Sequence, residues 1–433
     1  MLQVFRNAWA DPSLRRKILF TLLIVVIFRF GSSIFVPFLD PDAVKNLISP
    51  TDGTIMNYLD ALTGGALSKG TLLAMSISPY INASIIVQLL AVAIPALERL
   101  QKEGDVGRKK LDTITKFVAL GIALFQAVAY YLALRNVDAV LYTKGFEGVL
   151  AAVTIVACFV AGASLIIWLG NLITQHGIGN GISMILYAGI ISGVPNMIMT
   201  LFKQIEVNPA ANWVFVPLIL VIYVVMIAFV ILMTNAERRI PVQYAKRVVG
   251  RKMYGGQSQH IPIKVAMAGV MPIIFAMTIM TLPTSIGMMF GVTPNSGHGF
   301  WSGVMQVFSS NHPVYAILYF FLIIAFNYFY VSMQYNPIQI ANDLKKNNGA
   351  IPGYRPGKPT SDFIHNSLSK ITLVGAIFLA IIAIFPIIFS NLTGLQGLSL
   401  GGTTILIVVG VALETVRVLE SQMMMRHHKG FLE

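Results

Sequence analysis

The sequence predicts an all-α membrane protein that crosses the bilayer ten times, and three observations support this prediction. Of the 433 residues, 56% are hydrophobic and only 11% are charged, with a mean hydropathy of +0.73. A soluble protein of this size carries roughly 25% charged residues. Apolar runs of the roughly 20 residues that a span needs recur along the chain. The Lys and Arg residues gather in alternate connecting segments.

The first apolar run could be mistaken for a signal peptide, because Arg15, Arg16 and Lys17 precede it. The run continues to Phe38, however, and no small-residue cleavage site follows it, so we expect a retained first span. The ten predicted spans lie at 18–38, 71–97, 117–134, 149–172, 181–202, 213–235, 265–291, 314–334, 371–391 and 401–419.

The distribution of positive charge predicts the orientation of the spans. If segment 1–17 is cytoplasmic, 25 of the 31 Lys and Arg residues fall in cytoplasmic segments and 5 in external loops. Cytoplasmic loops carry the excess of Lys and Arg in membrane proteins, so we expect both termini, including the tail 420–433, to be cytoplasmic. The remaining cation, Arg29, lies within the first span, where it could snorkel or pair with a backbone carbonyl.

Ten spans divide into two halves, 18–202 and 203–419, that start on opposite sides of the membrane. If the halves are structural repeats, they must therefore be inverted. Pro79 lies in the second span of the first half, and Pro272 lies in the second span of the other half. A proline inside a span disrupts a backbone hydrogen bond, which only protein or a watery cavity can replace. The alternative explanation is that membrane helices generally contain more proline than soluble ones.

The segment 54–69 is too short to span a bilayer and too apolar for an ordinary loop. Ile55, Leu59, Leu62 and Ala66 fall on one helical face, so the pattern predicts a short helix. Gly64 and Gly65 would lie in its middle, each lowering helix stability by about 1 kcal/mol relative to Ala. From the residues alone, a re-entrant packing helix explains this segment as well as a movable one.

Two long cytoplasmic loops, 236–264 and 335–370, carry much of the charge. The first holds seven Lys and Arg residues against one carboxylate, Glu237. The second contains "IPGYRPGKP", in which three prolines and two glycines surround Arg355 and predict a shaped, semi-rigid turn. Orientation alone does not require a shaped basic tip, so we favour a docking surface for a polyanion or an acidic protein.

The sequence lacks the motifs that are typical of several functional classes. No G-x-x-x-x-G-K-[ST] motif is present, so the chain cannot hydrolyse ATP by that route. "GIGNGIS" (177–183) does not fit a nucleotide fingerprint and instead predicts a turn with Asn180 as the N-cap of the fifth span. The single Cys158 cannot form an internal disulfide. We predict no catalytic residue, no metal site and no cofactor.

Two further functional classes can be weighed from the residues alone. A secondary transporter also favours inverted repeats and broken helices, but it normally displays ionisable groups within its spans. Here only Arg29 and Glu414 are of that kind. An intramembrane enzyme would need a catalytic constellation at depth, and the spans show none.

The strings "SPYINASIIVQLL", "GIGNGIS", "QSQHIPIKVAMAGVMP", "IPGYRPG" and "GGTTILIVV" occur in this order along the chain. Together they resemble the SecY family, the large subunit of the protein-conducting channel of bacterial plasma membranes. The resemblance implies ten transmembrane helices in two inverted five-helix halves around a central hourglass pore. It also implies that segment 54–69 is a plug, which blocks the pore until a polypeptide displaces it.

The resemblance further implies roles for individual residues. The narrow waist of the pore would be a ring of aliphatic side chains, namely Ile77, Ile81, Ile182, Leu186, Ile274 and Ile407. The plug would include Tyr58, Leu59, Leu62, Gly64, Gly65 and Leu67. A lateral gate between the second and seventh helices would include Pro79, Gln88, Pro272, Thr278 and Thr281.

The partners of the family follow from the same resemblance. The SecA ATPase or a translating ribosome would dock on the basic loops and supply the energy that this chain lacks. The small subunits SecE and SecG would brace the bundle, and signal sequences and unfolded polypeptides would be the substrates. The residues expected to bind the cytoplasmic partners are Lys246, Arg247, Arg251, Lys252, Arg355 and Lys358.

Overall fold

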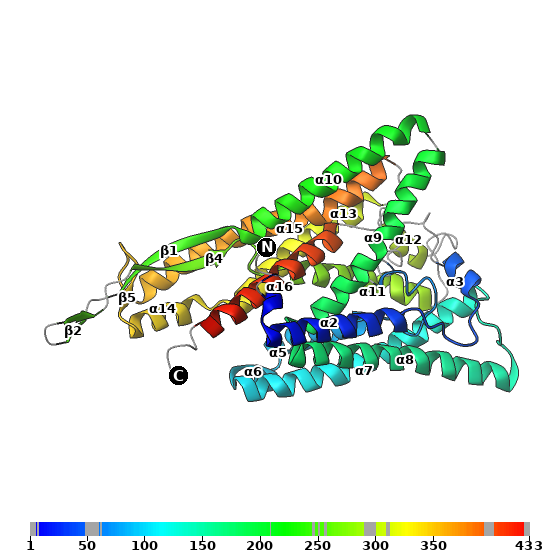
Figure 1. Cartoon of the computed structure of the whole chain (residues 1–433), viewed down its shortest axis with the longest axis horizontal. Coiled ribbons are helices and arrows are strands. Elements are labelled where there is room, and N and C mark those ends of the chain that lie inside the picture. The colour runs from blue at the N-terminus through cyan, green and yellow to red at the C-terminus, as the bar shows by residue number, and fades with distance from the viewer. Residues whose placement is uncertain are drawn as a thin grey trace.

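The computed structural model describes residues 6, 8–47, 60, 63–207, 209–244, 247–249, 252–254, 258–289, 300–308, 312–393 and 402–427. Long helices dominate the described chain (Figure 1). The helices are α2 (Pro12–Gly31), α3 (Pro41–Leu47), α5 (Ser78–Ala93), α6 (Pro95–Lys102), α7 (Asp105–Asn136), α8 (Gly145–His176), α9 (Gly181–Val207), α10 (Pro209–Asn235), α11 (Met271–Met289), α12 (Phe300–Val307), α13 (Pro313–Gln334), α14 (Pro337–Lys346), α15 (Lys358–Thr393) and α16 (Gly402–His427).

A helix lies over each of the ten predicted apolar runs. Among the described residues, five helices are long and apolar enough to cross a membrane by length and composition. A sixth span results if α5 and α6, which bend by 107° at Ile94, are counted together. The structure is therefore that of a helical, multi-span membrane protein, and the count of ten spans stays a prediction.

The second and seventh predicted spans begin later than expected, and here the sequence interpretation was wrong. Residues 72–77 and 265–270 form turns, so α5 begins only at Ser78 and α11 at Met271. Pro79 and Pro272 are thus in the first turns of their helices, where a missing N–H leaves no helical hydrogen bond broken. At the other end, Pro95 forces Ile94 into an extended conformation, which ends α5.

The two turns before α5 and α11 repeat the same hydrogen bonds. The N–H of Ser76 donates to the carbonyl of Leu73, and that of Gly269 donates to the carbonyl of Ala266. Both residues, three positions before their prolines, have left-handed backbones, with φ of 48° at Ser76 and 59° at Gly269. The carbonyl of Ile77 accepts the N–H groups of Tyr80 and Ile81, just as that of Val270 accepts those of Ile273 and Ile274. This local correspondence supports the predicted relation between the halves.

Three large apolar clusters lie in the interior of the described helical part. One cluster contains only residues between Val36 and Ala163, centred on α7 and α8. A second contains residues between Tyr223 and Leu413, from α10, α11, α13, α15 and α16. The third cluster, here called the central cluster, joins the two parts because α2, α8 and α9 meet α16 there. Each half of the chain therefore packs its own core, and the central cluster lies where the two halves meet.

The two charged loops fold together, which the sequence did not predict. β1 (Glu237–Tyr244) and β4 (Ser258–Lys264) pair in antiparallel fashion, with Ile240 opposite Ile261. β5 (Gly349–Ala350), from the other loop, pairs with the opposite edge of β1 and gives the order β4-β1-β5. A separate ribbon of β2 (Arg247–Val249) and β3 (Lys252–Tyr254) extends the hairpin.

The three-stranded sheet, α14 and the first turns of α15 form a unit, here called the sheet module, that projects from the bundle (Figure 1). It has its own apolar core, including Ile240, Val242, Leu344, Ile351 and Ile364. In Figure 1 the sheet module and the described C-terminal end lie toward the left, whereas α3 and α12 lie toward the right. The charged module and the short helices therefore lie at opposite ends of the molecule along its long axis.

The left-handed Ser76 leads to a testable prediction about stability. Its side chain is 2% exposed, and its hydroxyl has no hydrogen-bond partner among the described residues. Ser76→Gly should stabilise the fold by about 1 kcal/mol, because left-handed strain of roughly 1–2 kcal/mol exceeds the entropic cost of Gly, roughly 0.5–1 kcal/mol. Thermal unfolding of the purified protein in detergent measures the change.

Ser76→Ala is the matched control, because it removes the hydroxyl but keeps the strained Cβ. We expect its melting temperature to lie between those of the wild type and Ser76→Gly. A melting temperature of Ser76→Gly below that of the wild type would contradict the assigned strain.

Candidate functional site

The central cluster contains five of the six side chains predicted for the pore ring. Ile77, Leu186 and Ile407 are buried within it, and Ile81 and Ile182 are partly buried against it. These side chains come from the start of α5, from α9 and from α16, which are far apart in the sequence. The fold therefore gathers branched aliphatic side chains from both halves at one place.

The sixth predicted ring residue, Ile274, is not part of the central cluster. Val270, one helical turn earlier, packs against that cluster instead. Val270 corresponds to Ile77 in the repeated turn geometry, whereas Ile274 corresponds to Ile81. The sequence carried a signal for this residue, since Ile77 and Val270 both precede a proline by two positions.

Local structure aligns the ring candidates within each element. The N–H of Ile81 donates to the carbonyl of Ile77 over 3.1 Å, so the two side chains lie one turn apart at the start of α5. The Oδ1 of Asn180 accepts the N–H of Ile182 over 3.0 Å, which confirms Asn180 as the N-cap of α9. The cap starts the helix at Gly181 and orients Ile182 and Leu186 along one face.

The predicted plug is only partly covered by the described residues. Tyr58, Leu59 and Leu62 lie outside them, whereas Gly64, Gly65 and Leu67 lie inside. The prediction that Gly64 and Gly65 sit in the middle of a helix was wrong. Their φ angles are 67° and 83°, which a right-handed helix cannot contain, so they form a turn.

The segment after these glycines is tightly held. The Thr63 hydroxyl accepts hydrogen bonds from the N–H groups of Ala66 and Leu67, each with an N···O distance of 3.2 Å. The Tyr130 hydroxyl, from α7, donates to the carbonyl of Leu67 over 2.8 Å. Leu67 itself is buried in the cluster centred on α7 and α8. These contacts anchor residues 66–71 to the first half of the bundle.

Asp60 lies beside this turn, in the loop between the first two predicted spans. Its Oδ1 accepts the N–H of Ser68 over 2.7 Å, and its carbonyl accepts the N–H of Gly65 over 2.9 Å. Burial raises the pKa of the Asp60 carboxyl, and the hydrogen bonds from Ser68 oppose that rise. The carboxyl therefore helps to close the turn that contains Gly64.

One hydrogen bond joins the two predicted gate helices. The Thr278 hydroxyl of α11 donates to Oδ1 of Asn82 on α5 over 3.2 Å. Gln88 does not face Thr278 in this way, because its amide donates to the Ser84 hydroxyl of its own helix. The Thr281 hydroxyl donates to the carbonyl of Thr278. Asn82 and Thr278 thus form a polar link across the predicted gate, and Asn82 was not among the predicted gate residues.

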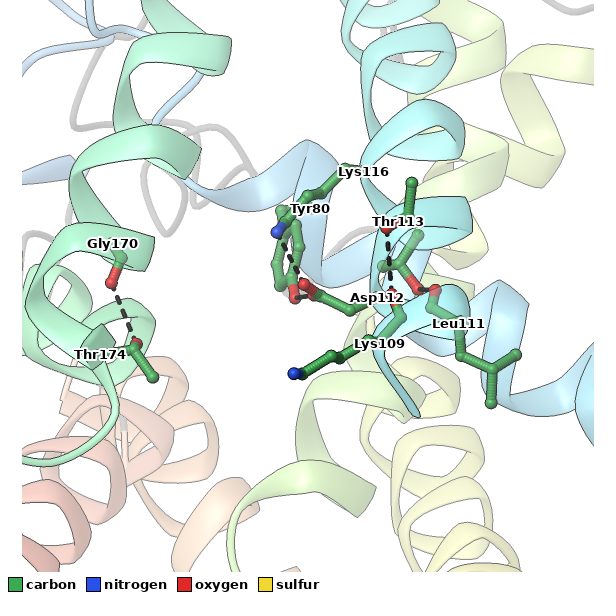
Figure 2. Close-up of polar contacts among 9 residues, drawn as sticks. Tyr80, Lys109, Leu111, Asp112, Thr113, Lys116, Gly170 and Thr174 are labelled. Atoms are coloured by element: carbon green, nitrogen blue, oxygen red, sulfur yellow. Dashed lines mark hydrogen bonds and ion pairs between the residues drawn. The ribbon is translucent and has the colours of Figure 1, made fainter. Parts of the chain in front are cut away.

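A second polar contact ties α5 to α7 (Figure 2). The Tyr80 hydroxyl donates to Oδ1 of Asp112 over 3.2 Å, and Nζ of Lys116 lies 2.6 Å from Oδ2 of the same carboxylate. The ion pair is partly exposed, so its contribution to stability is of the order of 0–1 kcal/mol. Its importance is geometric, because it fixes the first turn of α5 beside the basic start of α7.

The tip around Arg355 has the shape that the sequence predicted. Gly353 and Gly357 have left-handed backbones, and the ring centroids of Tyr354 and Phe363 are 4.3 Å apart. The Thr360 hydroxyl donates to the carbonyl of Arg355 over 2.8 Å, which holds the backbone of the tip. The side chains of Arg355 and Lys358 remain exposed on the sheet module.

The other predicted docking residues are less completely described. Arg247 and Lys252 lie in β2 and β3, and Lys246 and Arg251 lie outside the described residues. Among the described residues, no group of three or more His, Cys, Asp or Glu side chains could hold a metal ion.

Comparison with known proteins gives a consistent result over the whole chain. The SecY family model matches residues 71–416. Protein translocase subunit SecY of Bacillus licheniformis is 40% identical over 441 residues, and that of Streptomyces galbus is 38% identical over 443 residues. SecY of Mycobacterium tuberculosis is 39% identical over 450 residues. In each case 100% of both chains is covered.

Solved structures share the fold at lower sequence identity. A protein-conducting channel aligns with a TM-score of 0.63 and 18% identity, covering 98% of this chain and 96% of that chain. A SecY structure, described for a plug domain that stabilises the closed state and maintains a membrane seal, aligns with a TM-score of 0.66, 18% identity and the same coverage. The family match and the full-length relatives together show that this chain belongs to the SecY family.

Proposed function

We propose that this chain is the channel-forming subunit of a Sec-type translocase, which moves unfolded secretory polypeptides across the bacterial plasma membrane. Its full-length similarity to SecY subunits is the observation that carries this function. As a member of that family the chain is a protein-conducting channel subunit and not an enzyme. The relationship gives no support to the alternative of a secondary transporter.

The proposed pore constriction consists of the aliphatic side chains of the central cluster. A narrow aliphatic collar excludes water and therefore ions when it is closed. The same side chains offer no specific hydrogen bonds, so polypeptides of any sequence can slide past them. Ile77, Leu186 and Ile407 support this role because they are buried together at the junction of the two halves. Val270 joins them as an additional ring residue.

The proposed plug is segment 54–69, which would cover the pore from the external side. In the proposal the plug moves away when a signal sequence binds, and hydrophobic segments leave sideways between α5 and α11. The hydrogen bond between Asn82 and Thr278 would be broken in that step. A partly buried neutral hydrogen bond of this kind supports an opening that an apolar signal segment can drive.

We also propose the inverted ten-span arrangement, with both termini and the sheet module on the cytoplasmic side. A SecA-type ATPase or a ribosome would dock on the sheet module, and small subunits of the SecE and SecG type would brace the bundle. Canine Sec61, which aligns with a TM-score of 0.62, is seen in a ribosome–channel complex. External energy is required, because the chain contains no phosphate-binding motif.

A cysteine in the ring tests the path of the polypeptide. In a Cys158→Ser background, Leu186→Cys should form a disulfide with a single cysteine in a stalled secretory precursor, because the precursor threads the collar. Gel electrophoresis without reductant measures the crosslink. The crosslink should require the signal sequence, the ATPase and ATP.

Val153→Cys is the control for this experiment, because Val153 is 64% exposed on α8 and would face lipid. It should give no crosslink to the same precursor. Equal crosslinking at the two positions, or none at any ring position, would contradict the proposed pore.

Reversal of one charge tests the docking surface. Arg355→Glu should weaken binding of the cytoplasmic partner by roughly tenfold, about 1.4 kcal/mol, because an exposed cation at the tip would meet an acidic surface. The loss should shrink at high salt, where exposed charges are screened. Titration of the ATPase or the ribosome against the reconstituted protein measures the dissociation constant.

Lys144→Glu is the matched control, because it changes the net charge equally but lies in an external loop of the proposed topology. We expect no change in partner affinity for this variant. An unchanged affinity of Arg355→Glu would remove the tip from the docking surface.

A further inference from the structure

Arg29 is an isolated cation in the last turn of α2, within the first predicted span. Its guanidinium Nη1 donates to the carbonyl of Gly64 over 3.3 Å and lies 3.4 Å from the Ser32 hydroxyl. The Ser32 hydroxyl in turn donates to the carbonyl of Arg29 over 2.7 Å. Of the two sequence-based alternatives, pairing with a carbonyl is therefore confirmed. A charged donor in an apolar bundle binds a carbonyl more strongly than a neutral donor does.

Gly64 fits between two helices with no space for a side chain. A Cβ at this position would collide with the Ser192 hydroxyl and the Gly189 carbonyl of α9, and would lie 3.0 Å from Nη1 of Arg29. The left-handed φ of 67° independently favours glycine here. Gly65 has a similar φ of 83°, but a Cβ there would meet nothing within 4 Å.

The same stretch of α9 also borders the ring candidates. Leu186 and Ile190 belong to the central cluster, and Gly189 and Ser192 are within one turn of them. Phe28, next to Arg29 on α2, belongs to that cluster as well. The Arg29–Gly64 contact therefore lies at the edge of the proposed constriction and joins the end of the plug to α2 and α9.

The chain after Gly65 has separate anchors. The Tyr130 hydroxyl donates to the carbonyl of Leu67, and the N–H of Val36 donates to the carbonyl of Gly70. A displacement of the plug can therefore turn at Gly64 and Gly65 while residues 66–71 stay in place. Such a movement must break the hydrogen bonds that Asp60 and Thr63 make with residues 65–68 and, from outside the segment, the contact between Arg29 and the Gly64 carbonyl.

The geometry assigns Arg29 as a positioning residue that holds the plug closed through the Gly64 carbonyl, with α9 as the surface on which Gly64 rests. This inference rests on the proposed channel function and adds to it the residue that restrains the plug. Arg29 touches no substrate in this role and acts only through the backbone of the plug.

The test compares single variants of the full-length chain in proteoliposomes, together with any subunits that copurify. Entry of iodide, measured by quenching of a trapped dye, reports the leak in the absence of a translocating polypeptide. Arg29→Gln and Gly64→Ala should leak at least tenfold faster than the wild type, a change equivalent to about 1.4 kcal/mol in favour of the open plug. Arg29→Lys, which keeps a charged donor, should restore part of the seal.

Gly145→Ala is the matched control, because Gly145 has a left-handed φ of 71° outside the plug and a Cβ there would meet nothing within 4 Å. It should stay sealed. Hydrogen–deuterium exchange of residues 60–67 provides a second measurement, in which Arg29→Gln should accelerate exchange while peptides of α7 and α8 remain unchanged. Faster exchange throughout the chain would mean general unfolding and would overturn the assignment.

Deletion of residues 54–67 separates the failure of this inference from failure of the plug itself. If the deletion leaks but Arg29→Gln and Gly64→Ala are as tight as the wild type, Arg29 does not restrain the plug and the channel proposal stands. If the deletion does not leak either, the plug assignment fails and the role of Arg29 fails with it.

Discussion

The need to satisfy backbone polar groups inside an apolar bundle governs this structure. Within lipid an unpaired N–H or carbonyl is strongly unfavourable, so irregular backbone is tolerated only where protein or a watery cavity covers it. The turns at 72–77 and 265–270 meet this condition through local hydrogen bonds such as Ser76 to Leu73 and Gly269 to Ala266. Because these turns replace helix, α5 and α11 begin inside the bundle, and Ile77 and Val270 reach the central cluster.

The same constraint explains how the described residues of the proposed plug are held. Residues 64–70 are neither helix nor strand, yet the side chains of Thr63, Asp60 and Tyr130 take up N–H and carbonyl groups of this stretch. Arg29 supplies the donor for Gly64. A cation in the last turn of α2 thereby serves as a backbone partner at the end of an apolar run.

The two basic loops lie apart from the apolar helical bundle. The two basic loops share one sheet, because β5 pairs with β1 beside the hairpin partner β4. The core around Ile240, Leu344 and Ile364 makes the sheet module a stable unit. A partner docked at the proposed surface around Arg355 would contact a unit that is connected directly to α10, α11, α13 and α15.

The sequence by itself determined the membrane class, the positions of the apolar helices, the family and most of the candidate ring. These follow from composition, from runs of apolar residues and from motifs such as "GIGNGIS", all of which are local properties. Only the tertiary structure decided where α5 and α11 begin, that Val270 and not Ile274 packs against the central cluster, and that Gly64 and Gly65 form a turn. It also decided that Arg29 pairs with Gly64, that Asn82 pairs with Thr278 and that the two loops form one sheet. The pairings depend on contacts between residues far apart in the chain, and the helix starts and the turn depend on left-handed backbones such as those of Ser76 and Gly64. The periodicity of apolar residues holds no information about either.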